Sequence, residues 1–290
     1  MRPIGCGYLS APKARSFFLL LTAMSVLAGV VEVQPAVAAS LPLTVIYKGQ
    51  SSQAAAGTVG GFNESCPRAA PHGISGFFGV GDKAAYGQVV LSISGPLAHG
   101  WTEGVLNLST SPEPFIAGAV CSSRSFVSRS RKIELSPNSI GGYTERCPKA
   151  DPRPISGSSA SANGIPADVF VAESAPAGHG WITTLVNRSA QPQTYLVGVT
   201  CAPATQRIRT LSSDVVTVPP DQTSSSNGRC GAAAPHATSG FFYPKASAQW
   251  GDVALALSGP TGPRGRVWLG AVVNLTNQPQ PVVIGTICIG

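Results

Sequence analysis

Short apolar runs that end in turn residues recur through residues 39–290 and predict β-strands. Three sets of such runs occupy residues 89–94, 169–174 and 253–258; residues 101–107, 181–187 and 268–274; and residues 115–121, 195–201 and 282–288. They are rich in apolar and β-branched residues and are bounded by turn formers, as strands are. Further candidate strands lie at 43–47, 132–135 and 215–218. No helical period is convincing in this region, so we expect strands alone.

The tryptophans show that these runs belong to a repeat. Trp101, Trp181 and Trp268 are each followed by Asn after 6 residues, Ser or Thr after 8, Pro after 11, Gly after 17 and Cys after 20. A Ser-x-Pro sequence precedes each Trp, and another Cys lies further upstream. A fixed period of this kind is typical of tandem structural units. We therefore divide the chain into β-repeats at residues 39–122, 123–202 and 203–290.

The predicted fold class is all-β, with three tandem repeats of four to five short antiparallel strands each. The repeats would close on one another as a prism with pseudo-threefold symmetry, or follow one another as three separate β-sandwich units. We favour the closed form, because the segments that join one repeat to the next contain candidate strands of their own. Flexible linkers, rich in Gly and Ser, would favour the separate form.

Six cysteines lie in the repeats, two in each. Six cysteines allow fifteen connectivities, but the repeat favours pairing within each copy. The expected disulfides are Cys66–Cys121, Cys147–Cys201 and Cys230–Cys288. A metal site is the alternative, but the chain has no Cys-x-x-Cys and no His at ligand spacing. We therefore expect neither a metal nor a cofactor.

Residues 1–38 are typical of a secretory signal peptide. Arg2, Lys13 and Arg15 form a basic start, residues 17–31 form an almost uncharged apolar run, and Ala36 to Ala38 supply a small-x-small cleavage pattern. An uncleaved anchor is the alternative, although the run is shorter than the roughly twenty residues of a membrane span. No other stretch is long and apolar enough, so we expect no membrane span in the mature chain. The expected location is secreted, periplasmic or extracellular.

The charge balance argues against nucleic acid as a partner. The formal net charge is +7 over 290 residues, and charged residues make up only 11% of the chain. Three of the basic residues belong to the predicted signal peptide. Proteins that bind nucleic acid concentrate many more basic residues on one surface.

An extracellular glycan or a cell-surface component is the partner class that the remaining features favour. Trp250 lies outside the repeated Trp position and is a candidate exposed aromatic, and Arg129 and Arg131 alternate as one face of a strand would. A solvated edge that resists aggregation is the alternative for the arginines. The repeated tryptophans share a face with apolar residues, so we expect core packing rather than sugar stacking. We also expect their rings to cover the repeated Gly three residues before each final Cys.

No catalytic residue can be assigned from the sequence. It contains no Gly-x-Ser-x-Gly and no His-Glu-x-x-His motif. Asp168 and Asp252 recur, but the first repeat has Gln88 there; the repeated His99 and His179 become Arg266 in the third. We therefore expect a non-catalytic surface or binding protein. The alternative is an extracellular hydrolase or inhibitor with a scattered site, in which both aspartates and a histidine would meet in one cleft.

Four asparagines open Asn-x-Ser/Thr sequences, namely Asn63, Asn107, Asn187 and Asn274. In a eukaryotic secretory pathway these are candidate glycan acceptors. Three of the four lie at the repeated turn after the Trp run, where Asn and Ser/Thr are also favoured for structural reasons. We favour the turn interpretation.

One motif covers nearly all of residues 39–290. It is best seen at Cys66, Pro67, Ser94, Pro96, Gly100, Trp101, Asn107, Ala119, Val120 and Cys121. This pattern resembles tandem β-repeats of secreted bacterial proteins, especially actinobacterial ones. The third repeat departs from it at Gly231 and Val267, and the second at Thr200. The resemblance implies export and β-structure, and it assigns no functional residue because most such proteins have no known activity.

Overall fold

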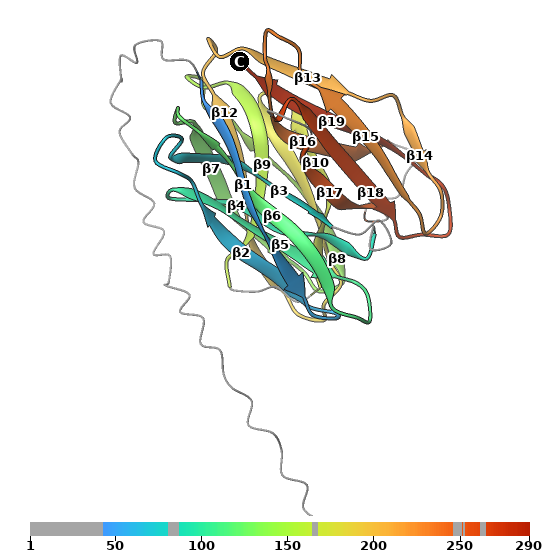
Figure 1. The fold of residues 1–290 in the computed structure, drawn as a ribbon. Helices are drawn as coiled ribbons and strands as arrows, with labels where there is room; N and C mark the ends of the chain where they lie inside the picture. Colours follow the sequence, from blue (N-terminus) through green and yellow to red (C-terminus); the bar gives the residue numbers. More distant parts are fainter. Residues whose placement is uncertain (1–42, 81–86, 164–167, 246–250, 252, 262–264) are drawn as a thin grey trace, which may run out of the picture. The chain divides into compact units, whose positions relative to one another are not determined.

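The computed structural model describes residues 43–80, 87–163, 168–245, 251, 253–261 and 265–290. The predicted signal peptide and Trp250 lie outside this part. The described residues form 19 strands in three antiparallel sheets, and no helix is found among them (Figure 1). The all-β prediction is therefore confirmed. Consistent with this, the described part contains no helix of the length and apolarity that a membrane crossing requires.

Residues 39–122, 123–202 and 203–290 are called the first, second and third segments below. The first contains β1 (Val45–Ala54), β2 (Val59–Ser65), β3 (His72–Val80), β4 (Val89–Leu97), β5 (Gly100–Asn107) and β6 (Glu113–Ser122). The second contains β7 (Val127–Leu135), β8 (Ser139–Arg146), β9 (Arg153–Ser161), β10 (Val169–Ala177), β11 (Gly180–Asn187) and β12 (Gln193–Ala202). The third contains β13 (Ile208–Ser212), β14 (Val216–Val218), β15 (Thr223–Arg229), β16 (His236–Pro244), β17 (Val253–Thr261), β18 (Val267–Asn274) and β19 (Gln280–Ile289). Each segment thus has six or seven strands, more than the four or five expected.

Every sheet is built from two segments. The strand orders are β1-β6-β3-β17-β18-β15, β2-β5-β4-β9-β12-β7 and β13-β19-β16-β10-β11-β8, with β14 also on β19. Within each sheet the two segments join where Ser258 lies opposite Phe78, Ser94 opposite Ser159, and Ser174 opposite Phe242. The serine of each Ser-x-Pro sequence is therefore a junction residue. This pairing excludes three separate sandwiches within the described residues, whereas the symmetry of a prism stays a prediction.

A bulge precedes each of these junction serines. The register of the pairing shifts between Leu91 and Ile93, between Val171 and Glu173, and between Leu255 and Leu257. A bulge bends its strand and increases the local twist. Because the shift falls at the same place in β4, β10 and β17, it turns all three strands just before each meets the neighbouring segment.

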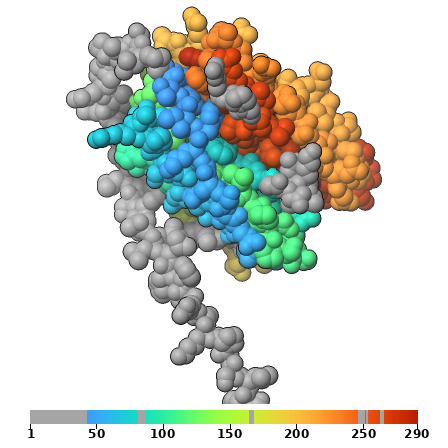
Figure 2. All heavy atoms as spheres, viewed as in Figure 1, coloured from blue at the N-terminus to red at the C-terminus, as the bar shows by residue number. Residues whose placement is uncertain are grey.

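Contacts between the first and third segments close the arrangement. The Tyr47 hydroxyl on β1 donates to the carbonyl oxygen of Ala237 at 2.7 Å and lies 2.8 Å from that of Gly265. Figure 2 shows the first segment (blue to green) beside the third (orange to red). One apolar cluster includes Phe78, Leu185 and Phe242, one from each segment. The core is therefore shared between the segments.

The three expected disulfides are present. Cys66 is bonded to Cys121, Cys147 to Cys201 and Cys230 to Cys288, at sequence separations of 55, 54 and 58. The opening cysteines directly follow β2, β8 and β15, and each is bonded to the last strand of its segment, which lies in a different sheet. The disulfides thus link the two sheets to which each segment contributes. Three such bonds are consistent with an oxidising compartment.

Candidate functional site

The three repeated tryptophans are core residues. Trp101, Trp181 and Trp268 are at most 1% exposed. Each indole Nε1 donates a hydrogen bond to a junction serine: Trp101 to Ser94 at 2.8 Å, Trp181 to Ser174 at 2.8 Å, and Trp268 to Ser258 at 2.9 Å. This explains why Trp and Ser recur together, since a buried indole N–H needs an acceptor. Rings enclosed in this way are not available for stacking on a sugar.

The glycines under these rings are not the ones that we expected. Space for a Cβ is blocked by the Trp ring at Gly157 and Gly240, and by the Glu103 carboxylate together with the Trp101 ring at Gly76. The predicted glycines are covered by other groups: Gly118 by Phe77, Gly198 by Ser158, and Gly285 by Phe241. The prediction is therefore wrong. The reason is that β3, β9 and β16 pass over the Trp rings, and sequence spacing alone did not show these strands.

A serine directly before each of these glycines connects the segments. Ser75 donates to the carbonyl oxygen of Thr238, Ser156 to that of Ile74 at 2.5 Å, and Ser239 to that of Ile155 at 2.6 Å. Each acceptor is the residue that precedes the corresponding serine of another segment. The three bonds therefore form a closed ring that includes all three segments. In the second segment the only sequence sign of this feature is Ser156-Gly157.

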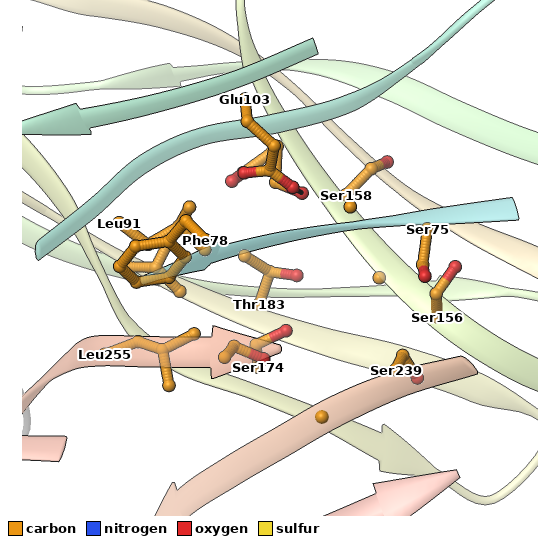
Figure 3. Close-up of a pocket in the computed structure, with 17 residues that line it drawn as sticks. Ser75, Phe78, Leu91, Glu103, Ser156, Ser158, Ser174, Thr183, Ser239 and Leu255 are labelled. Carbon is orange, nitrogen blue, oxygen red and sulfur yellow. Dashed lines mark hydrogen bonds between the residues drawn. The ribbon is translucent and has the colours of Figure 1, made fainter. Parts of the chain in front are cut away.

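A small polar cavity lies beside this ring of serines (Figure 3). Its volume is about 40 Å³, and its lining combines the serines with apolar residues. Glu103 on β5 and Thr183 on β11 also line it, and they occupy corresponding positions two residues after Trp. Burial raises the pKa of Glu103 well above its usual range, although hydrogen bonds from Ser94 and Trp101 oppose the shift. Glu103 is not among the site residues predicted from the sequence.

The predicted basic pair lies on an edge strand. Arg129 and Arg131 are both exposed on β7, which is the last strand of its sheet. The guanidinium of Arg131 lies 3.6 Å from the Glu145 carboxylate and 5.8 Å from the centre of the Tyr143 ring. Arg131 therefore connects β7 to β8 in the facing sheet. The role of Trp250 lies outside the described residues and stays a prediction.

The repeated histidines are turn residues. The backbone carbonyl oxygens of His99, His179 and Arg266 each accept a hydrogen bond of 2.8 Å from the N–H of the opening cysteine of their segment. Because only the backbone makes this contact, Arg serves as well as His in the third segment. Burial lowers the pKa of His72, with a smaller contribution from His99, so these two histidines lie near each other.

Asp168 lies far from His179, which follows β10, and from His236 on the neighbouring strand β16. Asp168 immediately precedes β10 and His179 follows it, so a strand of about 30 Å lies between them. His236 begins β16, which runs antiparallel to β10 and places it at the end near His179. Asp252 lies outside the described residues. The described part thus does not bring Asp168 together with either histidine.

A groove breaks the similarity of the segments. It has a volume of about 180 Å³ and lies between β13, β15 and β19 of the third segment. Its lining consists of Leu211, Ser212, Ser213, Ser226, Asn227, Gly228, Arg229, Ile284, Gly285 and Thr286. Hydroxyl and amide groups thus alternate with apolar surface, and Arg229 is the only charged side chain among these residues.

The other two segments have larger side chains at the corresponding positions. An ion pair joins the first two strands there, Lys48 with Glu64 at 2.6 Å in one and Arg131 with Glu145 in the other. Gly228 lies opposite the repeated Trp, as the two glutamates do in the first and second segments. By the same strand pairing, Ser226 occupies the position of Phe62 and Tyr143. Loss of the acid and of the aromatic ring leaves the groove open in the third segment.

Comparison with known proteins assigns no family. No model of a known protein family matches the chain, and no curated protein is significantly similar to it. The site is therefore interpreted from its own chemistry. In the described residues, no three of the His, Cys, Asp and Glu side chains are grouped as metal ligands would be. The groove offers hydrogen-bond donors and acceptors with little charge, which is an arrangement for binding a neutral polar molecule.

Proposed function

We propose that this chain is an exported, non-catalytic binding protein whose groove in the third segment takes a neutral polar ligand, with one sugar unit of a glycan as the best match. The observation that carries this proposal is the replacement of an ion pair and an aromatic ring by Gly228 and Ser226, which opens a groove of about 180 Å³. That volume is below the roughly 300–1,000 Å³ of pockets for drug-sized ligands. It suits one ring of a longer chain rather than a whole large ligand.

The chemistry of the lining supports a carbohydrate over an ionic ligand. Ser226 and Thr286 offer hydroxyl groups and Asn227 offers an amide, all of which pair with sugar hydroxyls. Leu211 and Ile284 supply apolar surface for the C–H face of a ring. A phosphate or sulfate would call for several cationic groups, whereas Arg229 is the only one in the lining.

Export and the modular organisation belong to the same proposal. The signal-like residues 1–38 and the three disulfides support passage into an oxidising compartment. The recurring motif and the matching strand order support three copies of one module, related to those of secreted bacterial proteins. In such a set, two copies would keep a structural role while the third carries the binding site.

Retention on a panel of immobilised polysaccharides tests the proposal. The wild-type mature chain is expected to bind at least one polysaccharide, and Ser226→Tyr, which restores the ring found at Tyr143 and Phe62, is expected to abolish retention. The paired change Arg129→Ala with Arg131→Ala is the matched surface control and should bind normally. Far-ultraviolet circular dichroism and a melting curve would verify that each variant is folded.

Other outcomes would assign binding to different residues or contradict the proposal. Loss of retention in Trp250→Ala or in the double arginine variant, with Ser226→Tyr unaffected, would place binding on those residues instead. Failure of the wild type to bind any polysaccharide would rule out the glycan version.

A further inference from the structure

Two polar atoms in the cavity beside the serine ring have no hydrogen-bond partner in the described protein. They are Oε2 of Glu103 and Oγ1 of Thr183. Glu103 is 2% exposed and Thr183 is 3% exposed, and both line the cavity (Figure 3). A buried polar group without a partner is energetically unfavourable. Two such groups facing one small space indicate that something polar occupies it.

The size and the lining of this cavity match water. A volume of about 40 Å³ exceeds the roughly 10–15 Å³ that one water molecule needs, and water occupies about 30 Å³ in the liquid. Ser174 and Ser258 each accept a bond from a Trp ring, which leaves their own protons for another acceptor. A buried water typically makes about three hydrogen bonds. Glu103, Thr183 and these serines can supply that number.

We propose that the cavity is an internal water site in which a neutral, protonated Glu103 donates a hydrogen bond to one or two ordered water molecules. The proton is assigned to Oε2, because Oε1 accepts a bond from the Ser94 hydroxyl at 2.8 Å. The water then accepts from Oε2 and from the free serine hydroxyls, and it donates to Oγ1 of Thr183. Both unpartnered atoms, Oε2 of Glu103 and Oγ1 of Thr183, gain a partner in this arrangement.

Among the residues that the structure describes, no neighbouring charge stabilises an ionised Glu103. The titratable side chains on the strands packed around the cavity are Tyr47, Lys48, Glu64, His72, Glu113, Arg153, Glu173, His236 and Tyr243. None of them lines the cavity. Lys48 and Glu64 pair with each other at 2.6 Å, Glu173 accepts a bond from Thr184 at 2.7 Å, and Arg153 donates to the Gln206 carbonyl at 2.5 Å. An ionised carboxylate would therefore be buried without a counter-charge, which is strongly unfavourable.

This site makes stability depend on pH in a defined direction. Burial raises the folded pKa of Glu103 well above its ordinary value of 4.5, whereas the unfolded chain keeps that value. The contribution of the neutral acid is fully present below the unfolded pKa and is lost as pH rises toward the folded pKa. The protein is thus expected to gain stability on acidification from this residue. No corresponding acid exists at Thr183 or Gly270. Because burial also raises the pKa of Glu173 in the second segment, the effect of Glu103 has to be isolated by substitution.

Glu103→Gln in the mature, disulfide-bonded chain tests this directly. The amide has the shape of the protonated acid but does not ionise. The urea midpoint of the variant is expected to equal that of the wild type at pH 4 and to exceed it at pH 7.5. The difference between the two curves isolates Glu103 from other titrating groups, including His72 and His236. A variant that is equally destabilised at both pH values would overturn the proposal.

Two measurements on the wild type do not depend on how the variant folds. Infrared spectroscopy at pH 7 should show the C=O stretch of a protonated carboxylic acid. The Glu103 band should be lost in Glu103→Gln and retained in the comparison variant Glu173→Gln, which removes the other acid whose pKa is raised by burial. A high-resolution crystal structure should show water within hydrogen-bond distance of Oε2. A cation bound to an ionised carboxylate, or a cavity without ordered density, would overturn the proposal.

Discussion

At the scale of single residues, three buried asparagines determine the turns that follow the Trp strands. Asn107, Asn187 and Asn274 are at most 1% exposed. The side-chain amide of Asn187 donates to the carbonyl oxygens of Ser136 and Gln191, both at 2.9 Å, and its oxygen accepts from the N–H of Ser189 at 3.0 Å. The other two make corresponding bonds. Enclosed amides of this kind support the turn interpretation of these sequons, whereas Asn63 is exposed on β2.

Replacing Asn187 with Ala should lower the free energy of unfolding by about 2–4 kcal/mol, because several buried backbone groups lose their partners at once. Urea denaturation of the oxidised protein measures this change. Asn63→Ala is the matched control and should stay within about 0.5 kcal/mol of the wild type, since its side chain is exposed. Equal effects of the two substitutions would contradict the structural role given to the buried amide.

The glycines under the tryptophans set a second residue-scale constraint. A Cβ at Gly157 would overlap the indole of Trp181, which is buried and hydrogen-bonded and so has no space to move into. Gly157→Ala is therefore expected to destabilise the protein by about 1–3 kcal/mol, as overpacking of a core does. Thermal unfolding followed by tryptophan fluorescence would report it.

Gly79→Ala provides the comparison for that measurement. A Cβ at Gly79 would meet Leu257 at 3.6 Å, which is ordinary contact. This change should be neutral or slightly stabilising, because Ala restricts the unfolded chain. If Gly157→Ala were as well tolerated as Gly79→Ala, the Trp ring would not limit the space above Gly157.

At the scale of strands, the sequence predicts those elements whose side chains are apolar. The runs assigned to β4 to β6, and to their counterparts, appear as strands in the structure. The missed strands include the edge strands β2, β8 and β15 and also the interior strands β3, β9 and β16. Strand β8, for example, alternates half-buried and exposed positions along its whole length. Their many Gly, Ser and charged residues resemble loops. Such strands are specified by pairing with a neighbour, which local sequence does not show.

The site was less predictable than the strands for the same reason. The serine ring and the glycines under the tryptophans depend on contacts between residues from different segments, such as Ser156 with Ile74. Glu103 did leave a sequence signal: on a two-residue period it shares the face of Trp101 and Val105, which was predicted to be buried. A charged residue on a buried face indicates an unusual environment. That signal is absent at Thr183 and Gly270.

At the scale of elements, the disulfides are expected to stabilise the fold by similar amounts. Each bond links the two sheets to which its segment contributes, and it closes a loop of 54 to 58 residues. Replacing either Cys66 and Cys121, or Cys147 and Cys201, by Ala pairs should lower the unfolding free energy by about 4 kcal/mol in the chain-entropy model. Because the loops are alike, the losses should agree within about 1 kcal/mol. A much larger loss from one pair would show that the segments do not share one construction.

At the scale of the whole molecule, the segments are mutually dependent. Residues Ser40–Gly290 belong to one compact unit, every sheet in its described part crosses from one segment to another, and the serine ring includes all three. A single segment would expose β3, β4 or their counterparts as unpaired edges with apolar faces, which favours aggregation over folding. About eighty residues also make a small core. Cooperative folding of all three segments is the expected consequence.

Fragments of the chain test this cooperativity. Residues 123–202 produced alone, with Cys147 and Cys201 oxidised, are expected to lack the dispersed amide spectrum of a folded protein, because their β9 and β10 lose the strands β4 and β16 on which they pair. The intact mature chain should unfold in one calorimetric transition, with equal calorimetric and van't Hoff enthalpies. The shared core, with Phe78, Leu185 and Phe242 in one cluster, gives the physical reason: removing one segment exposes apolar side chains of the other two. An independently folded fragment, or three separate transitions, would mean that the junction strands contribute little and that the segments behave as separate sandwiches.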